Sequence, residues 1–397
     1  MLNKQAILMM ESIRQSRSAT LIIKAALPSL YAFTFSPSLP AIAKQFTLKF
    51  FDAGLLIIVF FLGSALGFFL YVSLLELYPK KVFKIGGLLL IFLGSTLCAL
   101  AGHTNQFLLF LSARFAIGIG CSLGFSSALF AAIACYSQTE IFRFFSLFLL
   151  TSALLSAFAT LACGLLAGMY GWQSSFYFLA GTALLLLLLL SLPSARKKTK
   201  PFPSAKIAPS FWIVSIMGCC LSIYSLFICS APFIGIHLTG LDTMHYSGWM
   251  LIPYLGAILA ALSIEYAHKW FSLQQLLSLG GKILFATALL YVGVFYFGYM
   301  SPWSLFFPML CIHAGLVFVG AAAGALAYKE RATASFHLLA YALAGCLCLS
   351  SLLLFTAVFI QKPLTFFLFF LTLLFATSYL TRFLRVKNSA YALKTEI

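Results

Sequence analysis

Long uninterrupted apolar runs dominate this chain and restrict what it can fold into. About 20 apolar residues are enough for a helix to cross the roughly 30 Å hydrocarbon core of a bilayer. Inside that core only helices and closed barrels satisfy every backbone polar group, and the alternation of barrel strands is absent here. We therefore expect a bundle of transmembrane helices.

Composition agrees with a membrane location. Of 397 residues, 62% are hydrophobic and only 8% are charged, and the mean hydropathy is +1.05. A water-soluble fold has no means of hiding so much apolar surface. The expected fold class is an all-α membrane protein.

Glycines, prolines and charged residues divide the apolar runs into twelve predicted spans. The spans are 20–36, 52–74, 83–102, 107–135, 144–168, 174–192, 211–234, 247–267, 276–298, 303–327, 336–359 and 364–384. A basic, proline-containing stretch separates two sets of six, which indicates a duplicated architecture with a pathway between the halves. The predicted parts are an N-terminal arm (1–19), a first six-helix half (20–192), a linker (193–210), a second half (211–384) and a tail (385–397).

Lysine and arginine are distributed unevenly between the two sides of the predicted bundle. The N-terminal arm, the connections after even-numbered spans and the tail hold most of the 25 basic residues. The positive-inside rule places that side, with both termini and the linker, in the cytoplasm of a cell-membrane protein. Because the basic residues are dispersed over many short loops, the net charge of +17 indicates contact with anionic lipid and not with nucleic acid.

Two polar residues interrupt apolar spans at comparable depth, namely Arg114 in the fourth span and His313 in the tenth. Arginine at the bilayer centre costs at least about 2.5–3.5 kcal/mol, so it must face protein or water. We expect both in a central cavity, where Arg114 contacts the substrate or holds its site through hydrogen bonds to carbonyls of neighbouring helices. A purely structural lock is the alternative role of Arg114. His313 is either a proton carrier or a packing residue, and Tyr31, Tyr224 and Tyr254 either line the cavity or face lipid.

Four stretches carry a family resemblance. They are SPSLPAIAKQF (36–46), VSLLELYPKK (72–81), RFAIGIG (114–120) and GMYGWQSSF (168–176). With them the chain resembles a major facilitator superfamily transporter, and within that superfamily the twelve-span drug:proton antiporter group that includes the Bcr/CflA-type exporters. The resemblance implies two six-helix halves that rock about a site at mid-membrane.

The loop at 72–81 is similar to the family's connection between the second and third spans. Glu76 stands at its acidic position, and Lys80 and Lys81 stand at its basic pair. The resemblance implies that these residues, with Arg143, form a conformational gate. The alternative is an ordinary solvated loop on the positive side.

Two departures from the family pattern bear on proton coupling. SAFATLACG (156–164) keeps only the glycine of the antiporter motif, and Phe33 stands where relatives often carry an acid. No predicted span holds an acidic residue at mid-depth. His313 is therefore the remaining candidate if a proton is carried, and otherwise the chain is a facilitator or exchanger.

Small residues recur at a spacing of four, which lets transmembrane helices approach closely. We assign to helix packing the glycines Gly118, Gly120, Gly124, Gly164 and Gly168.

These features together predict a monomeric secondary transporter of a small organic molecule. Arg114 makes the cavity positive, which favours an anionic or neutral substrate, and a proton or another ion is the expected coupling partner. Efflux follows from the resemblance; import of a nutrient or metabolite is the alternative, and a non-transporting scaffold is a third reading. No HExxH, GxSxG, nucleotide-binding or metal-ligand pattern occurs, so we expect no enzyme, catalytic residue, metal or cofactor.

Overall fold

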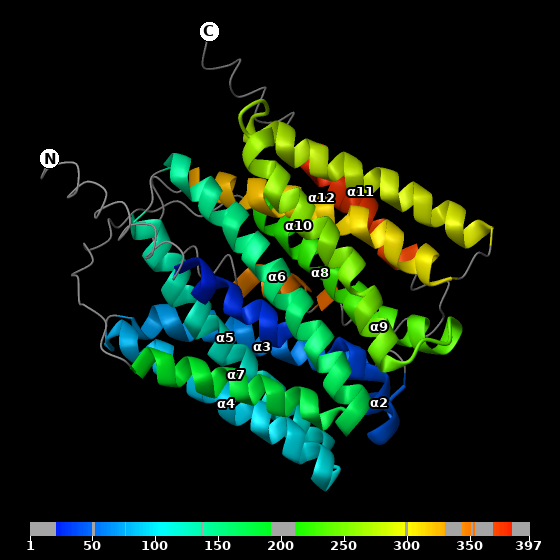
Figure 1. Ribbon diagram of the computed structural model, residues 1–397. Coiled ribbons are helices and arrows are strands. Elements are labelled where there is room, and N and C mark those ends of the chain that lie inside the picture. Colours follow the sequence, from blue (N-terminus) through cyan, green and yellow to red (C-terminus); the bar gives the residue numbers. More distant parts are fainter. Residues whose placement is uncertain are drawn as a thin grey trace, which may run out of the picture.

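Helices account for nearly every described residue of the protein (Figure 1). The computed structural model describes residues 21–49, 52–75, 77–135, 138–191, 211–297, 301–329, 344–350, 352–353 and 368–382. The named elements are η1 (Ser36–Ser38), α2 (Leu39–Gln45), η2 (Asp52–Gly54), α3 (Leu55–Leu74), α4 (Lys80–Thr104), α5 (Phe107–Cys135), α6 (Gln138–Tyr170), α7 (Gln173–Ser191), α8 (Phe211–Phe233), η3 (Ile234–Leu238), α9 (Thr243–Trp249), α10 (Leu251–Ala267), α11 (Leu273–Tyr296) and α12 (Pro302–Lys329). In this part of the chain, eight helices are long and apolar enough to cross a membrane.

The long helices form two groups that meet along α6. In the first group α3 and α4 pack against α5, and α7 packs against α4; in the second, α8, α10 and α11 pack against α12. Helix α6 lies between α5 and α7 in sequence but also packs against α9, α10 and α12, as Figure 1 shows. The predicted linker, 193–210, lies outside the described residues. Of the last two predicted spans, the structure describes helical residues 344–350, 352–353 and 368–382.

The first predicted span is broken and not continuous. Helical residues 21–32 end in a turn at 33–35, and the short elements η1 and α2 follow. Pro37 and Pro40 explain the break, because proline lacks a backbone N–H and clashes with the preceding helical turn. The last carbonyl groups of helix 21–32 therefore have no donors from a next turn and need partners elsewhere.

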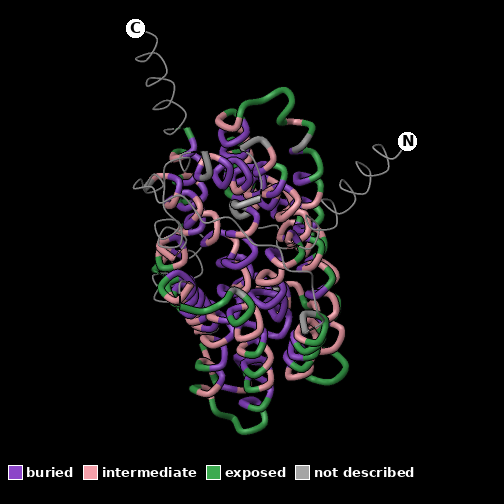
Figure 2. Tube along the Cα trace, turned by 90° about the vertical axis from the view of Figure 1, so that its left-hand side faces the viewer, coloured by how far each residue is buried: buried purple, intermediate pink, exposed green. Residues whose placement is uncertain are grey.

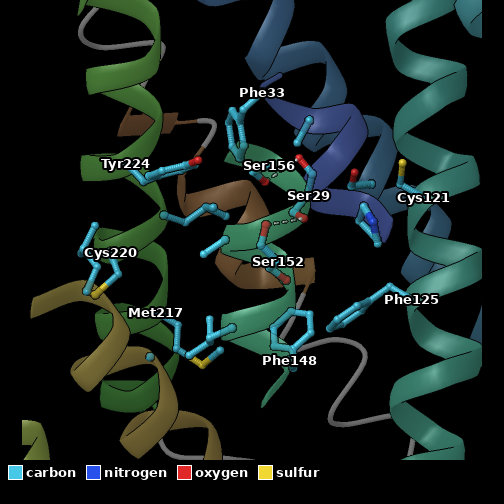
Figure 3. Close-up of a pocket in the computed structure, with 18 of the residues that line it drawn as sticks. Ser29, Phe33, Cys121, Phe125, Phe148, Ser152, Ser156, Met217, Cys220 and Tyr224 are labelled. Carbon is cyan, nitrogen blue, oxygen red and sulfur yellow. Dashed lines mark hydrogen bonds between the residues drawn. The ribbon is translucent and has the colours of Figure 1, made fainter. Parts of the chain in front are cut away.

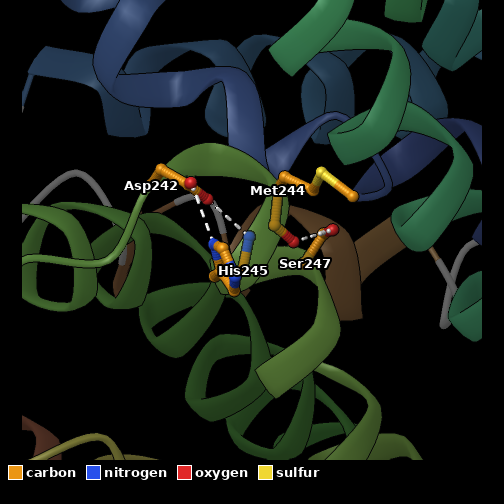
Figure 4. Close-up of polar contacts among 4 residues, drawn as sticks. All are labelled: Asp242, Met244, His245 and Ser247. Atoms are coloured by element: carbon orange, nitrogen blue, oxygen red, sulfur yellow. Dashed lines mark hydrogen bonds and ion pairs between the residues drawn. The ribbon is translucent and has the colours of Figure 1, made fainter.

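The eighth predicted span begins with the separate short helix α9, which Asp242 caps. Its Oδ1 accepts the backbone N–H of His245 at 2.6 Å, and Oδ2 lies 2.9 Å from the Nδ1 of the same histidine (Figure 4). The hydrogen bonds from His245 hold the pKa of the exposed Asp242 carboxyl below its usual value. The cap fixes where α9 begins, and this helix brings Met244 and Ser247 against α6.

Burial is concentrated between the helices, while many outward faces are both exposed and apolar (Figure 2). Phe158 is 66% exposed, Leu188 59% and Leu290 46%. Side chains of this size on the outside of a bundle fit hydrocarbon and not water. The apolar outer faces agree with the predicted membrane fold.

Candidate functional site

A cavity of about 410 Å³ lies between the two groups of helices. Residues of helix 21–32, α3, α5 and α6 form one side, and residues of α8, α10, α12 and the 344–350 helix form the other. In Figure 3, Phe33 and Tyr224 stand at one end of the cavity, and Met217, Phe148 and Phe125 stand at the other. The cavity is thus elongated along the helices and shared by both halves.

Aromatic rings and hydroxyl groups dominate the cavity wall. Its polar side chains other than cysteine are Ser29, Ser64, Ser122, Ser152, Ser156, Tyr224, Tyr254 and His313. Among the described residues that line it, none is Lys, Arg, Asp or Glu. Such a wall offers stacking surfaces and neutral hydrogen-bonding groups to a ligand.

Three of the sequence-predicted site residues come together in this wall, each from a different helix. Tyr224 of α8 donates its hydroxyl hydrogen to Tyr254 of α10 at 3.4 Å, and the ring of His313 on α12 lies 5.1 Å from the Tyr224 ring. The Tyr254 hydroxyl also pairs with Thr160 Oγ1 of α6 at 3.1 Å. This chain of hydroxyl groups therefore links the two helix groups.

One end of the cavity is closed by contacts between the two groups. The rings of Phe33 and Tyr224 meet edge to face with centroids 4.8 Å apart. Further along α6 towards Tyr170, the backbone of Gly164 lies so close to Ser247 of α9 that an added Cβ would overlap it. From the closed end the cavity extends towards the ends of α5, α6 and α8 that adjoin residues 136–137 and 192–210.

Arg114 lies behind the cavity wall. It is fully buried and is not one of the residues that line the cavity. Its guanidinium donates to the carbonyls of Tyr31 (3.0 Å), Ala32 (3.0 Å) and Leu56 (3.4 Å). It also lies over the rings of Phe35 and Phe60, at 4.3 and 4.9 Å from their centroids.

The interrupted first span explains this placement. Tyr31 and Ala32 end helix 21–32, so their carbonyls are the unpaired acceptors that a helix C-terminus presents, and a cation there also complements the helix dipole. Gly118, one turn beyond Arg114, lets α5 approach the backbone of α3 at Phe60. Of the two roles that the sequence leaves open, these contacts favour the structural lock.

Tyr31 also differs from its expected position. Its side chain is fully buried and its hydroxyl pairs with Thr182 Oγ1 of α7 at 3.2 Å, and it is not part of the cavity wall. The next aromatic residue, Phe33, lines the cavity instead. Phe33 lines the cavity in place of Tyr31 because helix 21–32 ends before Phe33, in the turn at 33–35.

The predicted gate is only partly visible. Glu76 lies outside the described residues, and α4 begins with Lys80 and Lys81, of which Lys81 is exposed. Arg143 is exposed on the first turns of α6. The gating role stays a prediction.

The five packing glycines fall into two classes. A Cβ would overlap a neighbouring helix at Gly118, Gly120 and Gly164. At Gly168 it would make only ordinary contact with Met244, and at Gly124 it would meet no described atom within 4 Å. Close approach between helices therefore requires glycine at Gly118, Gly120 and Gly164.

The cavity serines were not predicted as site residues. Ser152 and Ser156 are four residues apart on α6, so they share one face of the helix and point to the same side. Ser156 donates to the carbonyl of Ser29 at 3.4 Å, and Ser29 donates to the carbonyl of Ser152 at the same distance. The four-residue spacing of Ser152 and Ser156 was the one feature of the sequence that could have indicated a polar helix face here.

Two groups of membrane-spanning helices around a shared central cavity are the architecture of a secondary transporter. Residues 25–335 match the family model described as Major Facilitator Superfamily, so the chain belongs to that superfamily of transporters. The predicted fold class and the prediction of a transporter rather than an enzyme are therefore confirmed, and the twelve predicted spans are consistent with this fold.

Two solved structures share the fold. One is the Major Facilitator Superfamily transporter FucP in the outward conformation, with 14% identity over 92% of this chain and 98% of that chain and a TM-score of 0.60. The other is a bacterial homologue of the iron transporter ferroportin in the outward-facing state, with 14% identity over 93% and 99% of the chains and a TM-score of 0.59. No curated protein sequence matches the chain. At this level of identity the likeness shows the fold alone.

Proposed function

We propose that this transporter moves a neutral, largely apolar organic molecule, and that it exports that molecule as the two helix groups rock about the cavity. The supporting observation is the cavity itself, which offers about 410 Å³ lined by aromatic rings and hydroxyl groups. No charged side chain occurs among its described lining residues. A permanently charged ligand would lose its hydration there without gaining an ionic partner.

The placement of Arg114 narrows the expected choice between anionic and neutral substrates to the neutral one. Three of its five N–H donors serve the carbonyls of Tyr31, Ala32 and Leu56, and the residue does not line the cavity, so it is not placed to grip a carboxylate there. Its charge still lies directly behind Phe60, which lines the cavity. That charge opposes a cation on the opposite face of the ring.

The direction of transport rests on the resemblance to Bcr/CflA-type exporters and on the predicted orientation. With the basic connections in the cytoplasm, the cavity extends towards the cytoplasmic side and is closed on the other side by the contacts of Phe33 with Tyr224 and of Gly164 with Ser247. An exporter loads its substrate in that state. If a proton is carried, His313 is the remaining candidate, since the described cavity wall holds no carboxylate; otherwise the protein is a facilitator or exchanger.

Three probes of similar size test the charge preference, namely naphthol (neutral), naphthoate (anionic) and N-methylquinolinium (cationic). We expect purified protein in lipid nanodiscs to bind naphthol at least tenfold more tightly than either ion, measured by fluorescence titration against empty nanodiscs. Ala257→Trp fills the cavity from α10 and should abolish the binding. The matched control is Leu189→Trp on the exposed face of α7, which should leave binding unchanged.

Tighter binding of either ion than of naphthol would contradict the proposed substrate class. Binding that survives Ala257→Trp would show that naphthol sits elsewhere than in this cavity.

A further inference from the structure

His313 has one ring nitrogen that pairs with no residue in the described part of the chain. Nδ1 lies 2.8 Å from the backbone carbonyl of Met309. A carbonyl can only accept, so Nδ1 carries the hydrogen and donates it. In the neutral ring Nε2 is then an acceptor, and it is buried with no hydrogen-bond partner in the described structure.

The phenol groups around the ring do not supply the missing donor. Tyr224 gives its hydroxyl hydrogen to Tyr254 at 3.4 Å, the Tyr254 hydroxyl pairs with Thr160 Oγ1 at 3.1 Å, and neither phenol is hydrogen-bonded to Nε2. Phe227, whose ring centroid lies 5.8 Å from that of His313, has no polar group. The described lining residues include no acid, so in this state of the transporter a protonated ring would be an unpaired buried charge, and the ring is neutral in it.

A buried acceptor without a donor is costly, and native folds keep few of them without a reason. His313 is only 3% exposed, yet it belongs to the cavity wall. Among the buried side-chain atoms without a partner, one other belongs to a lining residue, the Oγ of Ser152 on α6. The two unpaired groups belong to residues that line the same cavity from opposite sides.

We infer that His313 Nε2 is the specificity-determining acceptor of this transporter, and that its substrate is a neutral aromatic molecule bearing an O–H or N–H donor. The inference rests on the proposed function, whose substrate class it narrows. The ring of Tyr224 packs edge to face against that of His313 with centroids 5.1 Å apart, and its hydroxyl is held by one long hydrogen bond, so Tyr224 is the side chain that moves aside when the donor enters. Ser152 offers a second hydrogen-bonding group to the same ligand from the other half.

A matched pair of probes isolates the donor, namely naphthol and its methyl ether, methoxynaphthalene. Both are neutral bicyclic aromatics, and only the first can donate a hydrogen bond. A site that holds an unpaired acceptor discriminates strongly against the analogue that lacks the donor. We expect wild-type protein in nanodiscs to bind naphthol at least tenfold more tightly than the ether, measured by fluorescence titration.

His313→Leu removes the acceptor and keeps a side chain of similar volume. It should reduce the ratio of the affinities for naphthol and for the ether to about one, mainly by weakening the binding of naphthol. Its retained affinity for the ether reports that the cavity is intact. His313→Gln offers an amide oxygen and should restore part of the preference. His103→Leu, at an exposed histidine near the end of α4, is the matched control and should keep the wild-type ratio.

Equal affinity of the wild type for both probes would overturn the inference, as would a ratio unchanged in His313→Leu. Where His313→Leu does not fold, a ratio in His313→Gln that lies between one and the wild-type value supports the inference, and a ratio in His313→Gln equal to that of the wild type overturns it. Failure of both probes to bind the wild type is a different result, because it would overturn the proposed neutral, largely apolar substrate itself.

Discussion

At Arg114 one planar guanidinium serves three backbone carbonyls, two of them at the broken end of helix 21–32. A lysine keeps the buried charge but is a compact point donor without the planar fork. Each hydrogen bond to a charged group contributes about 1.5–3 kcal/mol. We expect Arg114→Lys to lower the free energy of unfolding by at least one such contribution, seen as a lower thermal unfolding temperature in detergent.

The control for that substitution is Arg382→Lys, at an exposed arginine near the end of the last described helix. It should leave the unfolding temperature unchanged. A stable Arg114→Lys protein that has lost only naphthol binding would instead support the cavity role that the sequence left open.

At the scale of elements, α6 carries two glycines that differ in their surroundings although they lie four residues apart. A Cβ at Gly164 would overlap Ser247 of α9, whereas at Gly168 it would make ordinary contact with Met244. Alanine stabilises a helix interior by about 1 kcal/mol relative to glycine. We therefore expect Gly164→Ala to lower the thermal unfolding temperature, while Gly168→Ala should leave it unchanged or raise it.

That pair of substitutions is its own control, because both change glycine to alanine on one helix. Equal effects at the two positions would mean that the approach of α6 to α9 does not limit packing. The comparison also bears on transport, since this approach closes one end of the cavity.

At the scale of the whole molecule, the direction of the cavity depends on which side of the membrane holds the basic connections. The positive-inside rule places residues 268–272 in the cytoplasm and residues 105–106 outside. A membrane-impermeant maleimide applied to intact cells should label Gln106→Cys and should not label Lys269→Cys until the membrane is opened. The reverse pattern would invert the orientation, and with it the exporting state that we propose.

The fold was largely predictable from sequence, and the reason is the solvent. A bilayer leaves the backbone no partner but itself, so each apolar run of sufficient length must be helical. The runs that became α3, α4, α5 and α12 show this directly. The break in the first span was harder to foresee, because Pro28 leaves helix 21–32 intact while Pro37 and Pro40 begin new elements.

The cavity was predictable only in part, because these helices are apolar on every side. A helix in water shows its buried face as an apolar stripe, but a helix between lipid and protein has no such contrast. Sequence therefore determined that Arg114, His313, Tyr31, Tyr224 and Tyr254 must avoid lipid or reach an interface, without determining which way each points. The tertiary structure decided that His313, Tyr224 and Tyr254 line the cavity while Arg114 and Tyr31 lie behind it. The physical reason is the turn at 33–35. It leaves helix-end carbonyls that need a donor, which Arg114 supplies, and it places Phe33 in the cavity wall.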